Sequence, residues 1–337
     1  MSAPLRVAIA GCGLIGGKRA EALAADDVVV GTYDVVREAA ERLGPAVDSY
    51  EALLALEPDV VVIATSHDQL SALGVQALEA GAHVLVEKPA GVSVAQVEAL
   101  AAAAERTGKL VKVGFNHRFH PGLARVAEEV HSGRWGEVLH VRGRYGHGGR
   151  VGYDREWRAE PARSGGGELI DQGMHLIDLT HWILGPLPLH SALLRTQFWD
   201  TSVDDNAALL LGEANSRTAP WATLHVSWTE WKNLFSLEVY CRTAKFHVEG
   251  LVRSYGPQKL RIFAMKPELG PPDVEEIDYS PEDPSWQAEW ANFSAAIAAG
   301  DESLIIGGLA DARYAWQTVE AAYAAGGYDD MRAEVGG

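Results

Sequence analysis

Short apolar runs alternate with amphipathic segments along the first third of the chain. Five runs have the length and composition of strands covered on both faces of a parallel sheet: residues 5–10, 28–32, 59–64, 83–86 and 110–113. Helices are expected up to residue 25, over 36–43, from 49, over 67–80 and from the Ser93–Gln96 capping signature to Gly108. This alternation predicts an α/β domain built on a doubly wound parallel sheet.

The regular alternation of strand and helix patterns ends after Pro121. A helix is expected to residue 131, then a strand over 137–146, a glycine-rich stretch over 146–167 and a helix over 169–184. Strand patterns then follow one another at 189–199, 206–212, 221–228, 235–241 and 244–249, before two closing helices at 286–299 and 308–324. Runs of strands with few intervening helices predict an α+β domain with a mainly antiparallel sheet.

The composition is that of a globular protein, with 47% hydrophobic and 22% charged residues in 337. A net charge of −17 disfavours nucleic acids and anionic membranes as partners, because both require basic surfaces. No apolar run approaches the roughly 20 residues that span a bilayer. The segment before Cys12 is too short for a signal peptide, and two cysteines make no disulfide framework or zinc cluster. A cytoplasmic protein is therefore expected.

A glycine-rich turn follows the first strand and opens the first helix. It reads Gly11-Cys12-Gly13-Leu14-Ile15-Gly16, a G-x-G-x-x-G pattern in the context that dinucleotide binding requires. The first glycine permits the tight turn, the second lets the backbone approach the pyrophosphate, and the third lets helix and strand pack closely. The free N–H groups of the helix then face the phosphates.

Asp34 ends the second strand, 18 residues after Gly16. A carboxylate there accepts hydrogen bonds from the ribose hydroxyls of NAD and repels the 2′-phosphate of NADP. Arg37 keeps NADP open as the alternative, because an arginine near this position can accommodate that phosphate.

The triplet Glu87-Lys88-Pro89 follows a strand directly, which places Lys88 at the carboxyl edge of the sheet, where open α/β folds bind ligands. A lysine there can hydrogen-bond a substrate hydroxyl and help to move its proton. Taken alone, a lysine after a strand is usually a surface residue.

These motifs occur in order with two further ones, GFNHRFHP at residues 114–121 and GGGELIDQGMHLID at residues 165–178. The series resembles the glucose-fructose oxidoreductase / inositol dehydrogenase / rhizopine-catabolism family. The resemblance implies an NAD-binding Rossmann domain over 1–120. It implies a substrate-binding and oligomerisation domain with an open sheet over 121–337, and a homodimer or homotetramer formed through that sheet.

The resemblance also implies a catalytic set of Lys88, Asp171 and His175, with no metal. Asp171 and His175 stand four apart on an expected helix, so both would project from one face, with His175 as general base. Asp178 is expected to be structural. The resemblance places the following further residues around the cofactor: Thr65, His67, Glu87, Lys88 and Asn116. Ser66, His67 and Leu70 depart from the family pattern there, so cofactor packing is expected to differ in detail.

The substrate is expected to be sugar-like. Trp157 and Arg158 resemble a sugar-modifying subgroup that oxidises a C3 hydroxyl before transamination in aminosugar and aminoglycoside biosynthesis; both are expected near cofactor and substrate, although an ordered loop with one packed tryptophan is the plainer interpretation. Four carboxylates are candidates for contacts with substrate ammonium groups: Glu168, Asp204, Asp205 and Glu230. An inositol or free-sugar dehydrogenase and a non-catalytic dinucleotide sensor remain the alternatives.

Overall fold

The computed structural model describes residues 4–328, which form two compact units. The first contains the described residues up to Asn116 together with Ser285–Arg313, and the second contains His117–Pro284 and the described residues from Tyr314 to Tyr328. None of the helices over residues 4–328 has both the length and the apolarity needed to cross a membrane.

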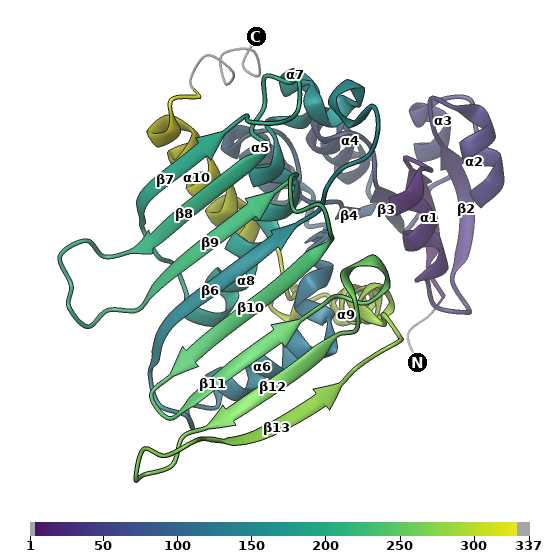
Figure 1. The fold of residues 1–337 in the computed structure, drawn as a ribbon. Helices are drawn as coiled ribbons and strands as arrows, with labels where there is room; N and C mark the ends of the chain where they lie inside the picture. Colours follow the sequence, from purple (N-terminus) through teal and green to yellow (C-terminus); the bar gives the residue numbers. More distant parts are fainter. Residues whose placement is uncertain (1–3, 329–337) are drawn as a thin grey trace. The chain divides into compact units, whose positions relative to one another are not determined.

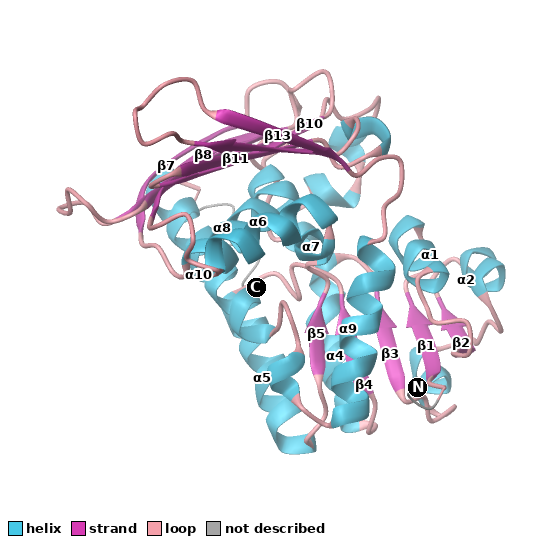
Figure 2. Ribbon diagram, turned by 90° about the horizontal axis from the view of Figure 1, so that it is seen from below, coloured by secondary structure: helices cyan, strands magenta, loops and turns pink. Residues whose placement is uncertain are grey.

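The first unit is built on a five-stranded parallel sheet with the order β2-β1-β3-β4-β5. The strands are β1 Arg6–Ala10, β2 Val28–Tyr33, β3 Val60–Ile63, β4 His83–Val86 and β5 Val111–Val113. β3 is buried along its whole length, as expected of a strand covered on both faces. The predicted doubly wound fold is therefore confirmed, and Figure 2 shows this sheet with its helices.

The helices between these strands are α1 Leu14–Glu21, α2 Arg37–Leu43, α3 Tyr50–Leu54, α4 His67–Glu79 and α5 Val94–Thr107. Ser93 caps α5 by accepting the Gln96 N–H at 3.3 Å, but the Gln96 side chain accepts the N–H of Val92, so the capping box is only half formed. The first helix ends earlier than predicted. Asp27 accepts the backbone N–H of Ala24 and turns the chain toward β2.

The helix α9, Ser285–Ala299, packs with the first unit rather than the second. Its Trp290 and Phe293 lie in the same apolar cluster as Val7 and Ile9 of β1. The Trp290 indole N–H also donates to Asp27 at 2.8 Å. The division at residue 120 therefore differs from the observed units for residues 285–313, because apolar packing brings this late segment back to the first sheet.

The second unit contains an eight-stranded sheet with the order β13-β12-β11-β10-β6-β9-β8-β7, antiparallel except for the β6–β9 pair (Figure 1). The strands are β6 Val138–Gly146, β7 Leu189–Arg195, β8 Asn206–Gly212, β9 Trp221–Ser227, β10 Leu234–Cys241, β11 Ala244–Glu249, β12 Lys259–Ala264 and β13 Asp273–Asp278. The last two strands were not predicted. β13 is an almost wholly exposed, acidic edge strand, so its sequence carries no apolar alternation.

The helices α6 Pro121–His131, α8 Met174–Leu184 and most of α10 Leu309–Gly326 lie on one face of this sheet, as Figure 2 shows. Gly143 of β6 permits the close approach of α8, because a Cβ there would stand 3.1 Å from a Leu176 methyl. The remaining short helices are Asn116–Phe119, Tyr153–Arg155, Trp157–Ala159, α7 Pro161–Ser164, Leu169–Gly173, Arg253–Tyr255 and Glu302–Leu304.

The predicted single helix over 169–184 is interrupted at its start. Leu169–Gly173 is a π-helical turn that runs directly into α8. Such insertions are rare in helices and occur frequently at functional sites. Here it carries Asp171 and precedes His175.

Candidate active site

The glycine-rich turn has the geometry predicted for it. Gly11 has φ +88°, and a Cβ there would lie 2.5 Å from the Ala64 carbonyl carbon. A Cβ on Gly16 would lie 2.0 Å from the Gly11 carbonyl oxygen, whereas Gly13 has open space beside it. Two glycines therefore shape the turn, and the third leaves its outer side open to a ligand. Leu14 is 78% exposed and Ile15 is half-buried at the same turn.

Asp34 is tied to this turn. Its carboxylate accepts the N–H of Cys12 at 2.6 Å and that of Val36 at 2.8 Å. The carboxylate is therefore held at the position from which ribose hydroxyls would be bound. Arg37 is an exposed side chain that pairs with Glu41 at 2.9 Å and with Asp48. Because two carboxylates already engage this guanidinium, the arrangement favours NAD over NADP.

Two other predicted cofactor residues follow β3. Thr65 lies beside the glycine turn, with its backbone nitrogen 2.7 Å from the Cβ position of Gly11. His67 is buried and is the first residue of α4. Both lie at the carboxyl end of a central strand, where ligands bind in this type of sheet.

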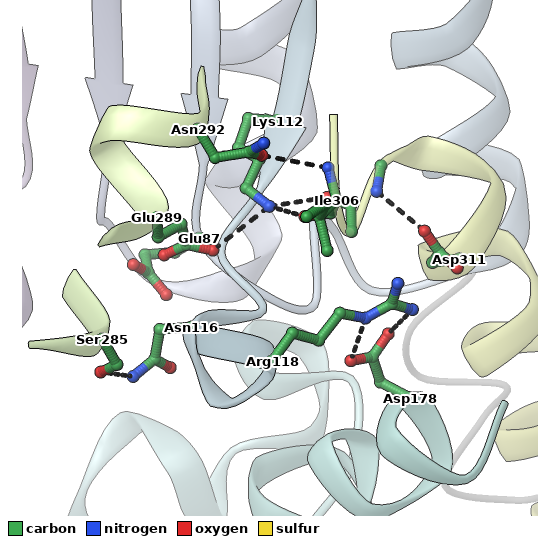
Figure 3. Close-up of polar contacts among 12 residues, drawn as sticks. Glu87, Lys112, Asn116, Arg118, Asp178, Ser285, Glu289, Asn292, Ile306 and Asp311 are labelled. Carbon is green, nitrogen blue, oxygen red and sulfur yellow. Dashed lines mark hydrogen bonds and ion pairs between the residues drawn. The ribbon is translucent and has the colours of Figure 1, made fainter. Parts of the chain in front are cut away.

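Glu87, another residue predicted beside the cofactor, has its carboxylate engaged within the first unit. It is buried and forms an ion pair with Arg19 of α1 at 2.5 Å. Arg19 also pairs with Glu289 of α9, which lies 3.6 Å from the buried Lys112 ammonium. Figure 3 shows the contact between Lys112 and Glu289. We name these four residues (Arg19, Glu87, Lys112, Glu289) the buried charge network.

This network anchors the chain immediately before Lys88. Lys88 follows the anchored Glu87 directly and precedes the cis peptide to Pro89. Gly114 packs against the Arg19–Glu87 ion pair. A glycine is required there, because a Cβ would stand 2.6 Å from Arg19 and 2.8 Å from Glu87. Asn116, another predicted cofactor residue, is buried, and its amide donates to Ser285 at 3.1 Å (Figure 3).

In the second unit, His175 lies buried on the first turn of α8. Its ring stacks on that of His117, with centroids 3.8 Å apart. The His117 ring in turn hydrogen-bonds the Tyr145 hydroxyl at 3.2 Å. Asp178, expected to be structural, is fully buried in a bidentate pair with Arg118 at 2.6 and 2.9 Å (Figure 3).

Asp171 is surrounded by polar groups from the glycine-rich stretch. The Tyr153 hydroxyl donates to it at 3.4 Å, and the Arg158 guanidinium lies 3.7 Å from it. Arg158 also stacks over Trp157, 4.6 Å from the ring centroid. The structure thus brings Trp157, Arg158 and Asp171 together, as half-exposed residues of one cluster.

A second group adjoins Asp171. His147, Glu168 and Asp171 present ligand atoms that lie within 4.8 Å of one another, a spacing that could hold a cation. The Gly149 N–H donates to Nδ1 of His147 at 2.9 Å. A neutral imidazole whose Nδ1 accepts a proton donor carries its own hydrogen on Nε2, so this ring presents a donor and not a metal ligand to the carboxylates.

Of the four carboxylates suggested for ammonium contacts, two are structural. Asp204 accepts the N–H groups of Gly167 and Leu169 and the Tyr323 hydroxyl. Asp205 accepts three consecutive N–H groups, from residues 197–199, which also ends β7 earlier than the sequence predicts. Glu168 is fully buried in the cluster, and Glu230 packs beside the end of β6.

Sequence reasoning missed His117, Tyr145, His147 and Tyr153. His117 stood within a motif already singled out. Tyr145 and His147 stand two apart at the end of a predicted strand, so they share one face of the sheet, and that spacing was the available signal.

Protein-family models match a large part of each unit. A model described as an oxidoreductase family with an NAD-binding Rossmann fold matches residues 5–115, and one of the GFO/IDH/MocA C-terminal domain matches residues 123–247. The chain belongs to the GFO/IDH/MocA oxidoreductase family. The glycine turn and Asp34 thus lie in the family's NAD-binding domain, and Asp171 and His175 lie in its C-terminal domain.

Individual relatives include a glucoside dehydrogenase and a levoglucosan dehydrogenase. A D-glucoside 3-dehydrogenase from Escherichia coli is 32% identical over 195 residues, 55% of this chain and 55% of that protein. Levoglucosan dehydrogenase in complex with NADH has a TM-score of 0.85 at 20% identity, covering 97% of this chain and 98% of the other. GenD2 from gentamicin A biosynthesis, in complex with NAD, has a TM-score of 0.79 at 24% identity, covering 97% and 95%. The chain spans about half the length of the curated relatives it matches.

Proposed function

We propose that this protein is an NAD-dependent dehydrogenase that oxidises a secondary hydroxyl of a sugar to a ketone. The observation that carries the proposal is the occurrence, in one chain, of a dinucleotide turn with its ribose-binding aspartate and of a buried histidine that closely follows a carboxylate in the helix. The first set would bind the cofactor, and the second suits the removal of a hydroxyl proton.

In this proposal the proton and the hydride leave the same carbinol. His175 takes the proton from the hydroxyl oxygen as general base, and the C–H bond breaks as the carbonyl forms. NAD, when bound, accepts the hydride. Lys88 hydrogen-bonds the reacting hydroxyl, and Asp171 orients the substrate through its network with Tyr153 and Arg158. No metal is required for this step.

The hydroxyl we propose is that on C3 of a pyranose. Support comes from the relative that is a D-glucoside 3-dehydrogenase and from the structural likeness to a gentamicin-pathway protein. The half-buried carboxylate of Asp171 and the Arg158–Trp157 stack offer hydrogen bonds and an aromatic face, which suit a sugar ring. The candidate substrates are glycosides, aminoglycosides and nucleotide or phosphorylated sugars, with transamination of the ketone as a later step.

The proposal is tested by following NADH absorbance with a panel of methyl α-D-glucoside, an aminoglycoside, UDP-glucose, glucose 6-phosphate and myo-inositol. We expect NADH to form with a glucoside or aminoglycoside. NADH formation with myo-inositol alone would instead favour an inositol dehydrogenase. Tight NADH binding without turnover of any member, in either direction, would contradict the dehydrogenase and favour a dinucleotide sensor.

We further propose that the protein forms a homodimer or homotetramer through the face of the eight-stranded sheet opposite to α6 and α8. A groove on this sheet is lined by residues of β10, β6, β9, β8 and β7, among them Leu193, which is 52% exposed. Trp221 of β9 is 41% exposed as well. Light scattering in solution is expected to give two or four times the mass of one chain. Replacing Leu193 by lysine should lower that mass. If the unaltered protein itself has the mass of a single chain, the proposed interface is contradicted.

A further inference from the structure

One histidine of the second unit has no part in the proton transfer described above. His147 follows the last residue of β6, and its backbone carbonyl accepts the N–H of Glu230 at 3.3 Å. Its ring is fixed at one end by the Gly149 N–H, which donates to Nδ1 at 2.9 Å. At the other end, Nε2 lies 3.5 Å from the Tyr153 hydroxyl, and the Tyr153 ring packs edge-on at 5.4 Å between centroids.

The direction of these hydrogen bonds follows from the backbone donor. Because Nδ1 accepts from Gly149, the neutral ring carries its hydrogen on Nε2 and donates toward Tyr153. The Tyr153 hydroxyl then has its own hydrogen available for Asp171, 3.4 Å away. Burial raises the pKa of Tyr153 far above its ordinary value, so the hydroxyl stays a donor at every relevant pH.

We propose that His147 is a positioning residue for Asp171. It aligns the Tyr153 hydroxyl as a donor to the Asp171 carboxylate, and so fixes the carboxylate that orients the substrate. This inference rests on the proposed dehydrogenase function. The resulting series of donors runs from the Gly149 amide through His147 and Tyr153 to Asp171.

Protonation of His147 would break this series. An imidazolium has hydrogens on both nitrogens, so Nδ1 would face the Gly149 N–H donor with a hydrogen of its own. Burial lowers the pKa of His147, which keeps the ring neutral near pH 7, although Asp171 opposes this shift. The charged and titratable groups around the ring are Asp171, Glu168, Tyr153, Arg158, Arg150 and Glu230.

The test compares His147→Leu with His147→Gln, since the glutamine amide retains a donor near the place of Nε2. We expect His147→Leu to lower kcat with the preferred sugar by about 10- to 100-fold, the effect of one hydrogen bond to a charged group, with NADH affinity unchanged. His147→Gln should stay within about 3-fold of the unaltered enzyme, because the donor is kept. Neither leucine nor glutamine can be protonated at this position, so the part of the acid limb of the kcat/KM profile that protonation of His147 causes should disappear in both variants.

A double-variant cycle with Tyr153→Phe shows whether His147 acts on Asp171 through Tyr153 or whether the two residues act independently. If His147 acts through Tyr153, the double variant is no slower than the slower single variant. Losses that multiply, or equal losses for leucine and glutamine, would overturn the proposal. Activity that is lost with EDTA and restored by Zn²⁺ or Mn²⁺ would also overturn it, since the ring would then be a metal ligand. If the unaltered protein turns over no sugar, the proposed function fails instead.

Discussion

Replacing His175 by asparagine should lower kcat for sugar oxidation by about 100- to 10,000-fold, the range measured for the loss of a general acid–base group. The asparagine side chain fills most of the same volume but cannot accept the hydroxyl proton. NADH should bind with unchanged affinity, because the glycine turn and Asp34 lie in the other unit of the chain. Single-turnover NADH formation and NADH fluorescence titration measure the two quantities separately.

The matched control for this substitution is His190→Asn, an exposed histidine on β7. It should leave kcat unchanged. Equal activity in His175→Asn and the unaltered enzyme would remove His175 from the proton transfer. A parallel loss of NADH binding would mean that the substitution had disturbed more than the second unit.

Replacing Glu289 by alanine should destabilise the protein by about 3–5 kcal/mol, the cost of removing one partner from a buried ion pair. Glu289 is fully buried between Arg19 and Lys112, so its loss removes a carboxylate that faces two buried cations. The same contacts hold α9 against the first sheet. We therefore expect a lower urea midpoint and weaker NADH binding, because Glu87 anchors the segment that carries Lys88.

An exposed ion pair provides the control. Arg106 and Glu79 form a bridge of 3.0 Å with both side chains more than half exposed. Arg106→Ala should change the free energy of unfolding by less than about 0.5 kcal/mol, since surface pairs contribute little. If Glu289→Ala lowers the urea midpoint no more than Arg106→Ala does, the buried charge network does not stabilise the first unit.

Strongly patterned elements of the fold could be predicted from the sequence. All five strands of the first sheet were found, because buried parallel strands are continuous apolar runs. β13 was missed because it is an exposed, acidic edge strand without apolar alternation. β12 does alternate, with buried Leu260 and Ile262 following Lys259 and Arg261 in turn, so its signal was present in the sequence and was overlooked. The return of α9 to the first unit was also missed, since it depends on tertiary packing of Trp290 and Phe293.

The chemistry of the site was harder to predict from the sequence than the fold was. The glycine turn and Asp34 carry a local signature, so their geometry followed from spacing alone. Glu87 has no such local signature. A carboxylate beside Lys88 suggests a ligand contact, and only the folded structure shows that Glu87 forms an ion pair with Arg19. The π-helical turn at Asp171 and the cluster with His147 likewise arise from segments that meet only after folding.

The central claim is that a sugar C3 hydrogen leaves as hydride to NAD while His175 accepts the hydroxyl proton. The most direct measurement uses methyl α-D-glucoside, or the preferred substrate of the panel, deuterated at C3, with mass spectrometry of the cofactor product. The account predicts deuterium in the reduced nicotinamide, a 3-keto sugar, and loss of both in His175→Asn. Reduced cofactor that contains no deuterium, with the ketone at another carbon, would contradict C3 oxidation, and undiminished transfer in His175→Asn would contradict the assigned base.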